Sequence, residues 1–332
     1  MGRELVYVRP MRAIIVERTG GPEVLQVGER PVPEPAAGEV LIRIRVAGVN
    51  YIDTYHRRGL YPLPLPFTPG IEGAGEVVKL GEGVNRFRPG ERVVFCLGMG
   101  GYAEYAAVPA WKVVPLPEGV DDEAGVTAMC QGLTAHYLTT DAFPLRAGQW
   151  ALVHAAAGGV GLLLVQMCRR LGAHVIGTVS TEAKAELARR AGADVVVRYP
   201  DEDFVARTKE VTGGKGVDVV YESVGRDTFQ GSLDCLRVRG TLVLFGQSSG
   251  PVPPLDPQIL NQKGSLFLTR PSLGHYVRDE VEFSWRAGAV LEMIRDGSLE
   301  VTIGERLPLT DAALAHRKLE GRQTVGKVLL LP

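Results

Sequence analysis

The sequence predicts an α/β protein in which a doubly wound parallel sheet is joined to a second, β-rich domain. Strand-like and helix-like segments alternate from residue 149 to residue 245, a spacing typical of parallel βαβ units. A glycine-rich turn follows the first of these strands. The chain before residue 132 instead contains short strands separated by Gly/Pro turns. With 332 residues, the chain is long enough for two domains of roughly 150 residues each.

The β-rich part is expected over residues 12–132. Residues 40–46 alternate apolar and polar side chains, as a half-buried strand does. Further short strands are expected at residues 73–79 and 92–96, separated by turns that contain glycine and proline. Four prolines between residues 61 and 70 make that segment an extended connection, because proline cannot continue a helix.

The doubly wound part begins at residue 149, and its first two helices end at Gly172 and Gly192, which are typical C-cap residues. Strands are expected at residues 150–154, 174–179, 194–197, 217–221 and 241–245, helices at residues 159–171, 181–191, 204–211 and 228–236, and residues 265–269 could add a sixth strand.

The last part of the chain has one clear helix, at residues 283–295, and ends in a strand-like run at 327–331, which we expect to return to the first domain. We therefore expect one domain formed by residues 1–135 and 280–332 and a second formed by residues 136–279.

Composition narrows the class of protein. The formal net charge is −1, so a basic surface for nucleic acid is not expected. Residues 1–10 lack the apolar core of a signal peptide, and no apolar run approaches the roughly 20 residues that a membrane helix needs. The four cysteines form no C-x-x-C pair, which disfavours a disulfide framework and a cysteine-rich zinc site. We expect a cytoplasmic protein.

The glycine-rich turn spans residues 154–161, His-Ala-Ala-Ala-Gly-Gly-Val-Gly, and lies between a predicted strand and a predicted helix. In this context the backbone of Gly158, Gly159, Val160 and Gly161 can approach a pyrophosphate at the helix N-terminus. Ala156 stands where the full G-x-G-x-x-G pattern has its first glycine, so the motif alone is weak. The strand–turn–helix context favours a dinucleotide site over a plain tight turn.

The second predicted strand indicates which dinucleotide. An NAD site carries Asp or Glu about 20 residues after the glycines, at the tip of this strand, whereas residues 178–181 are Thr-Val-Ser-Thr. Ser180 and Lys184 are therefore interpreted as a pocket for the 2′-phosphate of NADPH. The alternative is a capping serine and a solvated lysine. The loops at residues 222–225 and 245–250 suit ribose and nicotinamide contacts, or are simple turns.

The reacting end shows no set of zinc ligands in the sequence. Glu72 follows isoleucine instead of histidine, and no cysteine precedes Cys96, so no catalytic metal is expected. Asn50 and Tyr55 remain as hydrogen-bond donors to a developing oxyanion, and tyrosine can also release its proton. The alternative is that Asn50 caps a turn and Tyr55 is a packing residue.

These residues resemble the zinc-independent NADPH:quinone oxidoreductases (the zeta-crystallin group) of the medium-chain dehydrogenase/reductase superfamily. The resemblance covers residues 11–332. It is carried by GVNYIDTY (48–55), QGLTA (131–135), HAAAGGVG (154–161), SVGRDT (223–228), FGQSSG (245–250), NQKGS (261–265) and TRPSL (269–273).

The resemblance implies a GroES-like substrate domain, a Rossmann domain and a homodimer joined through the Rossmann sheet edges. It implies that Asn50, Tyr55 and Thr134 lie near the nicotinamide and that Tyr61 and Asp53 edge the substrate cleft. The cofactor contacts that it implies are Gly159, Val160, Ser180, Lys184, Tyr199, Ser223, Phe245, Gly246, Ser248 and Arg270. Ser180 departs from the glycine that close relatives can have.

The expected activity is metal-independent hydride transfer from NADPH to a quinone-like carbonyl acceptor, with small molecules as the only partners besides a second subunit. One alternative is an enone or alkenal (enoyl) reductase that uses NADPH. An NADPH-responsive RNA-binding or regulatory protein is another, disfavoured by the charge balance. A zinc alcohol dehydrogenase is a third, disfavoured by the missing ligands.

Overall fold

The computed structural model describes residues 10–332. The prediction that residues 1–10 are not a signal peptide falls almost entirely on residues 1–9, which lie outside the described part. The chain divides into two compact units. Unit 1 comprises Met1–Cys130, Asp279–Arg295 and Ile303–Pro332, and unit 2 comprises Gln131–Arg278 and Asp296–Thr302.

The division differs from the expected one at three places: residues 131–135 and 296–302 belong to unit 2 and not to the first domain, and Asp279 belongs to unit 1. The side-chain amide of Gln166 explains the placement of residues 296–302. It donates to the Glu300 carbonyl over 2.9 Å and accepts from the Glu300 N–H over 2.8 Å, which ties the segment to a helix of unit 2.

Unit 2 is built on a six-stranded parallel sheet, which confirms the predicted doubly wound fold. The order β10-β9-β8-β11-β12-β13 reverses between β8 and β11, so this is the point where ligands bind in such sheets. The strands are β8 (Trp150–Val153), β9 (His174–Val179), β10 (Val195–Arg198), β11 (Val217–Glu222), β12 (Leu236–Leu244) and β13 (Phe267–Thr269).

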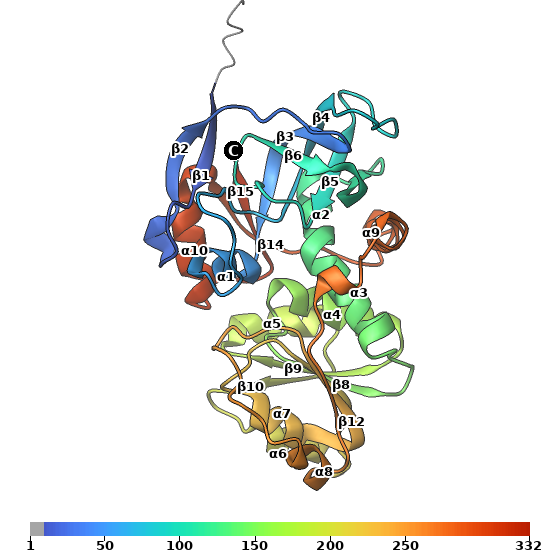
Figure 1. Ribbon diagram of the computed structural model, residues 1–332. Coiled ribbons are helices and arrows are strands. Elements are labelled where there is room, and N and C mark those ends of the chain that lie inside the picture. The colour runs from blue at the N-terminus through green and yellow to red at the C-terminus, as the bar shows by residue number, and fades with distance from the viewer. Residues whose placement is uncertain (1–9) are drawn as a thin grey trace, which may run out of the picture. The chain divides into compact units, whose positions relative to one another are not determined.

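Helices cover both faces of this sheet, with α4 and α5 on one side and α6 and α7 on the other (Figure 1). They are α4 (Gly159–Arg170), α5 (Glu182–Arg190), α6 (Phe204–Val211), α7 (Phe229–Cys235) and α8 (Gln258–Gln262), and the short α3 (Thr134–Tyr137) precedes the sheet. Because both faces are covered, the central strands read as continuous apolar runs such as Ala151, Leu152 and Val153, all fully buried. Burial of a leucine or valine side chain such as Leu152 or Val153 contributes roughly 1.5–3 kcal/mol.

Unit 1 contains a seven-stranded sheet of order β14-β15-β3-β4-β5-β7, with β6 paired to β3, and a separate β1–β2 hairpin. Its strands are β1 (Met11–Ile15), β2 (Gln26–Arg30), β3 (Glu39–Val49), β4 (Glu72–Leu80), β5 (Arg92–Cys96), β6 (Tyr105–Pro109), β7 (Val113–Pro115), β14 (Ile303–Pro308) and β15 (Lys327–Leu331). β15 pairs antiparallel with β3, which places Leu329 opposite Gly48. The C-terminal run therefore returns to the first unit, as predicted.

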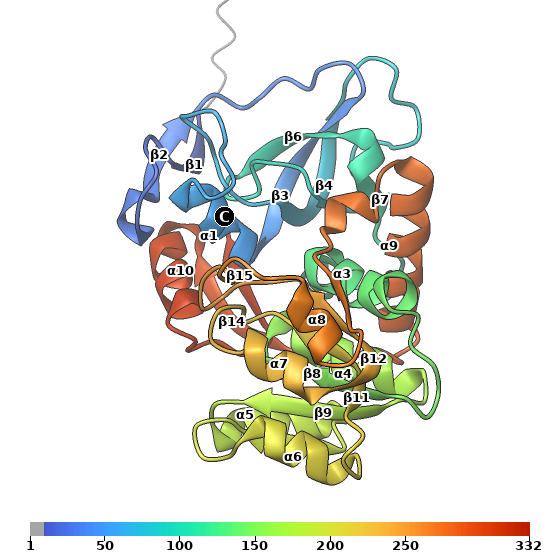
Figure 2. The same ribbon diagram turned by 60° about the horizontal axis from the view of Figure 1, so that its bottom comes forward.

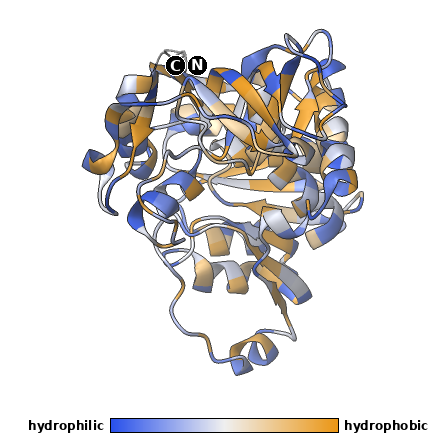
Figure 3. Ribbon diagram, turned by 45° about the horizontal axis from the view of Figure 1, so that its top comes forward, coloured by the Kyte–Doolittle hydropathy of each residue, from blue (hydrophilic) through white to orange (hydrophobic). Residues whose placement is uncertain are grey.

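Four helices complete unit 1: α1 (Tyr51–Arg58), α2 (Asp122–Thr127), α9 (Glu280–Arg295) and α10 (Ala312–Glu320). α1 and α10 lie side by side in both orientations of the ribbon (Figures 1 and 2). Hydrophobic residues, drawn in orange, are concentrated in the strands, whereas helices and loops also carry many hydrophilic residues, drawn in blue (Figure 3). Among residues 10–332, no helix combines the length and the apolar character needed to cross a bilayer.

Candidate active site

The glycine-rich turn lies between β8 and α4, as the sequence predicts. Gly158 is the N-cap of α4 and offers no side chain to the N–H groups of the first helical turn. A Cβ on Gly161 would overlap the backbone of Ala155, and one on Gly159 would overlap the side chain of Gln131. Close packing against backbone therefore requires glycine at position 161, and the uncapped helix N-terminus can accept an anion such as a pyrophosphate.

Ser180 and Lys184 are brought together at the tip of β9, where Lys184 Nζ lies 3.5 Å from Ser180 Oγ. The cap of α5 is Thr181, whose hydroxyl accepts from the Lys184 N–H, so the alternative of a capping serine at position 180 is not observed. The nearby carboxylate of Glu182 accepts from Arg189 over 2.7 Å. Because Arg189 balances the negative charge of Glu182, this carboxylate repels a phosphate at the tip of β9 less strongly.

Tyr199 follows β10 and lies beside this tip, because its N–H donates to the carbonyl of Val179. Two other residues that the resemblance places at the cofactor, Thr134 and Arg270, lie at the ends of elements of unit 2. Thr134 begins α3, three residues after the Gln131 side chain that lies against Gly159. Arg270 follows β13, the edge strand of the sheet.

The loops after β11 and β12 form one paired layer at the carboxyl end of the sheet. The Ser248 N–H donates to the Ser223 carbonyl over 3.1 Å, and the Phe245 N–H donates to the Glu222 carbonyl over 2.9 Å. A Cβ on Gly246 would lie 2.7 Å from the Ser223 carbonyl oxygen, so the close approach requires glycine there. The structure therefore gathers Ser223, Phe245, Gly246 and Ser248 in one place.

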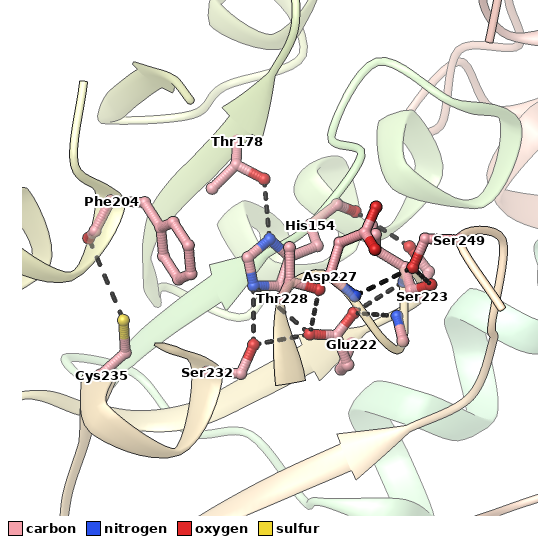
Figure 4. A network of polar contacts seen from close by, with 12 residues as sticks. His154, Thr178, Phe204, Glu222, Ser223, Asp227, Thr228, Ser232, Cys235 and Ser249 are labelled. Carbon is pink, nitrogen blue, oxygen red and sulfur yellow. Dashed lines mark hydrogen bonds and ion pairs between the residues drawn. The ribbon is translucent and has the colours of Figure 1, made fainter. Parts of the chain in front are cut away.

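A buried polar network lies beneath these loops, with Glu222 and His154 at its centre (Figure 4). Burial acts to raise the pKa of Glu222, but the N–H and hydroxyl donors around the carboxylate hold it below its ordinary value. Burial lowers the pKa of His154, which favours the neutral imidazole. The sequence predicts Glu222 only as part of a coenzyme-contacting loop and does not predict its buried hydrogen bonds, although a carboxylate at the end of an apolar strand is a signal of a paired buried charge.

In unit 1, Asn50 lies between β3 and α1 and its side chain is held on both sides. Its Nδ2 donates to Glu72 Oε1 over 2.7 Å, and its Oδ1 accepts from Lys327 Nζ over 3.0 Å. Lys327 and Glu72 form an ion pair, and both are fully buried. A Cβ on Gly48 would overlap this pair, so glycine provides the space for it. The amide of Asn50 is fixed in orientation and keeps one hydrogen for another acceptor.

Glu72 also belongs to a group of possible metal ligands that the sequence analysis missed. One ligand atom each from Glu72, Cys96 and Cys130 lie within 4.8 Å of one another. The expectation that the ligands are too few is thus corrected, because folding joins the end of β5 to the helical turn at Cys130. The residues nevertheless fit a metal poorly, since the Lys327 ammonium is already paired with Glu72 and the Cys130 N–H donates to Glu72 Oε2 over 2.6 Å.

Asp53 is fully buried within unit 1, which corrects the expectation that it edges a substrate cleft. Its Oδ2 accepts from the Asn50 N–H over 2.8 Å at the start of α1 and from the Tyr102 hydroxyl over 3.0 Å. Burial raises the pKa of Asp53 to about 7. The carboxylate therefore holds the first turn of α1 in place and can influence a reaction only through Asn50 and its neighbours.

Tyr55 and Tyr61 are brought together by the left-handed turn at Gly59 that ends α1. Their rings meet edge to face with centroids 5.4 Å apart, an arrangement that aromatic pairs favour. Tyr55 is buried and Tyr61 is exposed. Together they form an aromatic group toward the C-terminal end of α1, whereas Asn50 lies at its N-terminus, and such a group suits a flat, unsaturated ligand.

Two family models match this chain, one within unit 1 and one almost entirely within unit 2. Residues 36–118 match the family model of the alcohol dehydrogenase GroES-like domain, and residues 159–282 match that of the zinc-binding dehydrogenases. The chain is 46% identical over 315 residues to a quinone oxidoreductase of Pseudomonas aeruginosa, covering 94% of this chain and 97% of that protein.

Two further similarities concern ligand and substrate. A 2-haloacrylate reductase of Burkholderia is 42% identical over 329 residues, covering 96% of this chain and 98% of that protein. The crystal structure of an Escherichia coli quinone oxidoreductase complexed with NADPH superposes with a TM-score of 0.94 at 44% identity, covering 97% of this chain and all of that one.

Proposed function

The chain belongs to the quinone oxidoreductase family of the medium-chain dehydrogenase/reductase superfamily, and on this premise we propose that it reduces a quinone-like acceptor with NADPH and without a metal. The observation that carries the proposal is the tip of β9, where Ser180 and Lys184 meet and Glu182 is paired with arginine. That arrangement favours a 2′-phosphate, and NADPH supplies a hydride at C4 of its nicotinamide when bound.

Unit 2 binds the coenzyme. The pyrophosphate is held at the N-terminus of α4, where the backbone N–H groups and the helix dipole favour an anion. The 2′-phosphate is held by Ser180, Lys184 and Tyr199. The remaining contacts are provided by Thr134, Ser223, Phe245, Gly246, Ser248 and Arg270.

Unit 1 orients and polarises the acceptor. Asn50 points one amide hydrogen at the carbonyl oxygen, in an orientation that Glu72 and Lys327 maintain. Tyr55 and Tyr61 pack against the flat ring, and Tyr55 or water returns a proton to the reduced oxygen. Lys327 supplies the positive charge within the Glu72 cluster, so no metal is required to balance that carboxylate.

The protein acts as a homodimer joined along β13. This strand is the edge of the unit 2 sheet, and its Phe267 side chain is 61% exposed. Val238 is 66% exposed, and Leu268 on β13 is partly exposed as well. An unpaired edge with exposed apolar side chains favours pairing with a second copy. All four cysteines are free thiols, which fits the reducing cytoplasm that we propose as its location.

The test is NADPH consumption with 1,4-benzoquinone, 9,10-phenanthrenequinone and a simple enone, together with metal analysis of the purified protein. We expect turnover of a quinone by metal-free protein. Turnover of the enone alone would instead identify an enone reductase, an alternative favoured by the similarity to the 2-haloacrylate reductase. Stoichiometric zinc would contradict the metal-independent mechanism.

A further inference from the structure

Glu222, at the end of β11, makes four hydrogen bonds although its side chain is fully buried. Oε1 accepts from the N–H groups of Val224 and Gly225 over 2.6 and 3.0 Å. Oε2 accepts from the hydroxyls of Thr228 and Ser232 over 2.8 and 2.6 Å. One carboxylate thereby folds the loop after β11 back onto the start of α7.

The network continues from Ser232 to β8 and β9. His154 Nε2 lies 2.9 Å from Ser232 Oγ, and His154 Nδ1 lies 2.9 Å from Thr178 Oγ1. Since Ser232 donates its only hydrogen to Glu222, it must accept from His154 Nε2–H. A neutral His154 then accepts from the Thr178 hydroxyl at Nδ1, so the direction of every hydrogen bond in the chain is determined.

Three of the four members of this chain lie next in sequence to a loop that we propose to contact the coenzyme, and the fourth, Ser232, lies within α7 and links them (Figure 4). His154 precedes the glycine-rich turn, Thr178 lies two residues before Ser180, and Glu222 precedes Ser223. The Ser223 hydroxyl also donates to the His154 carbonyl over 3.4 Å. All four side chains of the chain are at most 2% exposed, so they cannot touch a bound dinucleotide themselves.

We propose that the chain Glu222–Ser232–His154–Thr178 is a positioning network that fixes the three coenzyme loops relative to one another and thereby sets coenzyme affinity. This inference rests on the proposed function, because it assumes that those loops bind NADPH. The two ends of the network have different effects. The Glu222 end positions the loops after β11 and β12, which serve NADPH and NADH alike, whereas the Thr178 end positions Ser180, which serves only the 2′-phosphate.

The test compares three variants in the full-length protein by measuring dissociation constants for NADPH and for NADH. Glu222→Gln replaces the carboxylate oxygen that accepts from the Thr228 and Ser232 hydroxyls with an NH₂ group, which is itself a donor. We expect the dissociation constants for NADPH and NADH to rise by roughly tenfold or more. Thr178→Val keeps the shape but removes one neutral hydrogen bond, and we expect a rise of about fivefold for NADPH and less than twofold for NADH. Ser232→Ala breaks the middle link, and we expect a rise of a few fold for both coenzymes.

A matched control distinguishes an effect on the position of the coenzyme loops from the general effect of losing a buried hydrogen bond. Thr212 is the C-cap of α6, before β11 begins, and its hydroxyl donates to the Thr208 carbonyl over 2.7 Å and accepts from the Gly216 N–H over 3.0 Å. We expect Thr212→Val to lower the melting temperature while leaving both dissociation constants and the acceptor KM unchanged. If Thr212→Val weakened coenzyme binding as much as Thr178→Val does, the network would be only part of the core.

Two outcomes would overturn the inference. One is a folded Glu222→Gln protein that binds NADPH with the parental affinity. The other is a Thr178→Val variant that weakens NADPH and NADH equally. Nitrogen NMR of the parent protein provides a spectroscopic check, because His154 should be the neutral Nε2–H tautomer. If the parent protein itself binds no NADPH, the proposed function fails instead, and this result is distinguishable from parental affinity in the variants.

Discussion

The buried ion pair between Lys327 and Glu72 allows the sharpest prediction about unit 1. Lys327→Met removes the ammonium while keeping the length of the side chain. The Glu72 carboxylate then remains fully buried with only two neutral donors, the Asn50 amide and the Cys130 N–H. Breaking a buried pair from one side typically costs about 3–5 kcal/mol. This is a large part of the roughly 5–15 kcal/mol that stabilises a typical domain.

The same substitution should slow the reaction. Asn50 Oδ1 loses its donor, so the amide hydrogen proposed to face the acceptor is no longer held in one orientation. We expect kcat to fall roughly tenfold or more, less than the approximately hundredfold or greater loss seen when such a donor is removed outright. Urea-induced unfolding measures the stability, and NADPH-dependent quinone reduction measures the activity.

Two comparisons complete this experiment. The double variant Glu72→Gln/Lys327→Met removes both charges and should recover part of the lost stability, because no buried charge is left unpaired. Lys318→Met breaks the partly exposed ion pair with Glu305 in the same unit and should cost about 1 kcal/mol or less. A loss below about 1 kcal/mol for Lys327→Met, or equal losses for the single and double variants, would refute the reasoning.

Three further predictions concern the coenzyme, the interface and pH. Lys184→Ala should raise the KM for NADPH far more than that for NADH in steady-state kinetics, and equal increases would exclude a role in binding the 2′-phosphate. Phe267→Glu should produce monomers in sedimentation velocity, whereas Val281→Glu, at an exposed position of α9, should not; a Phe267→Glu dimer would contradict pairing along β13. Folding raises the pKa of Asp53 from 3.8 to about 7. Between these two pH values the folded protein binds more protons than the unfolded chain. The free energy of unfolding should therefore fall as the pH rises, by up to about 1.4 kcal/mol per pH unit. Asp53→Asn should remove that slope from unfolding curves measured between about pH 4 and pH 7, and an unchanged slope would assign it to another group.

The sequence alone determined the features that depend on local patterns. The alternation of strands and helices after residue 149 predicted the doubly wound sheet, because hydrophobic period and glycine C-caps are properties of neighbouring residues. The strand–turn–helix context of Gly158–Gly161 predicted a pyrophosphate site for the same reason. The absence of Asp or Glu at the tip of β9 depended only on counting residues from the glycines.

The tertiary structure alone decided which polar groups share a site. Glu72 and Lys327 are 255 positions apart, and they meet because β15 pairs with β3 next to β4. Folding also brings Cys96, on the strand paired with β4, and Cys130, in a helical turn, to Glu72, so the count of metal ligands made along the sequence was incomplete. Buried charges are stable only where folding supplies a partner, and sequence patterns encode local conformation but not these distant partners. This is why the turn at Gly158–Gly161 could be identified from its neighbours, whereas the pairing of Asn50 with Glu72 and Lys327 required the fold.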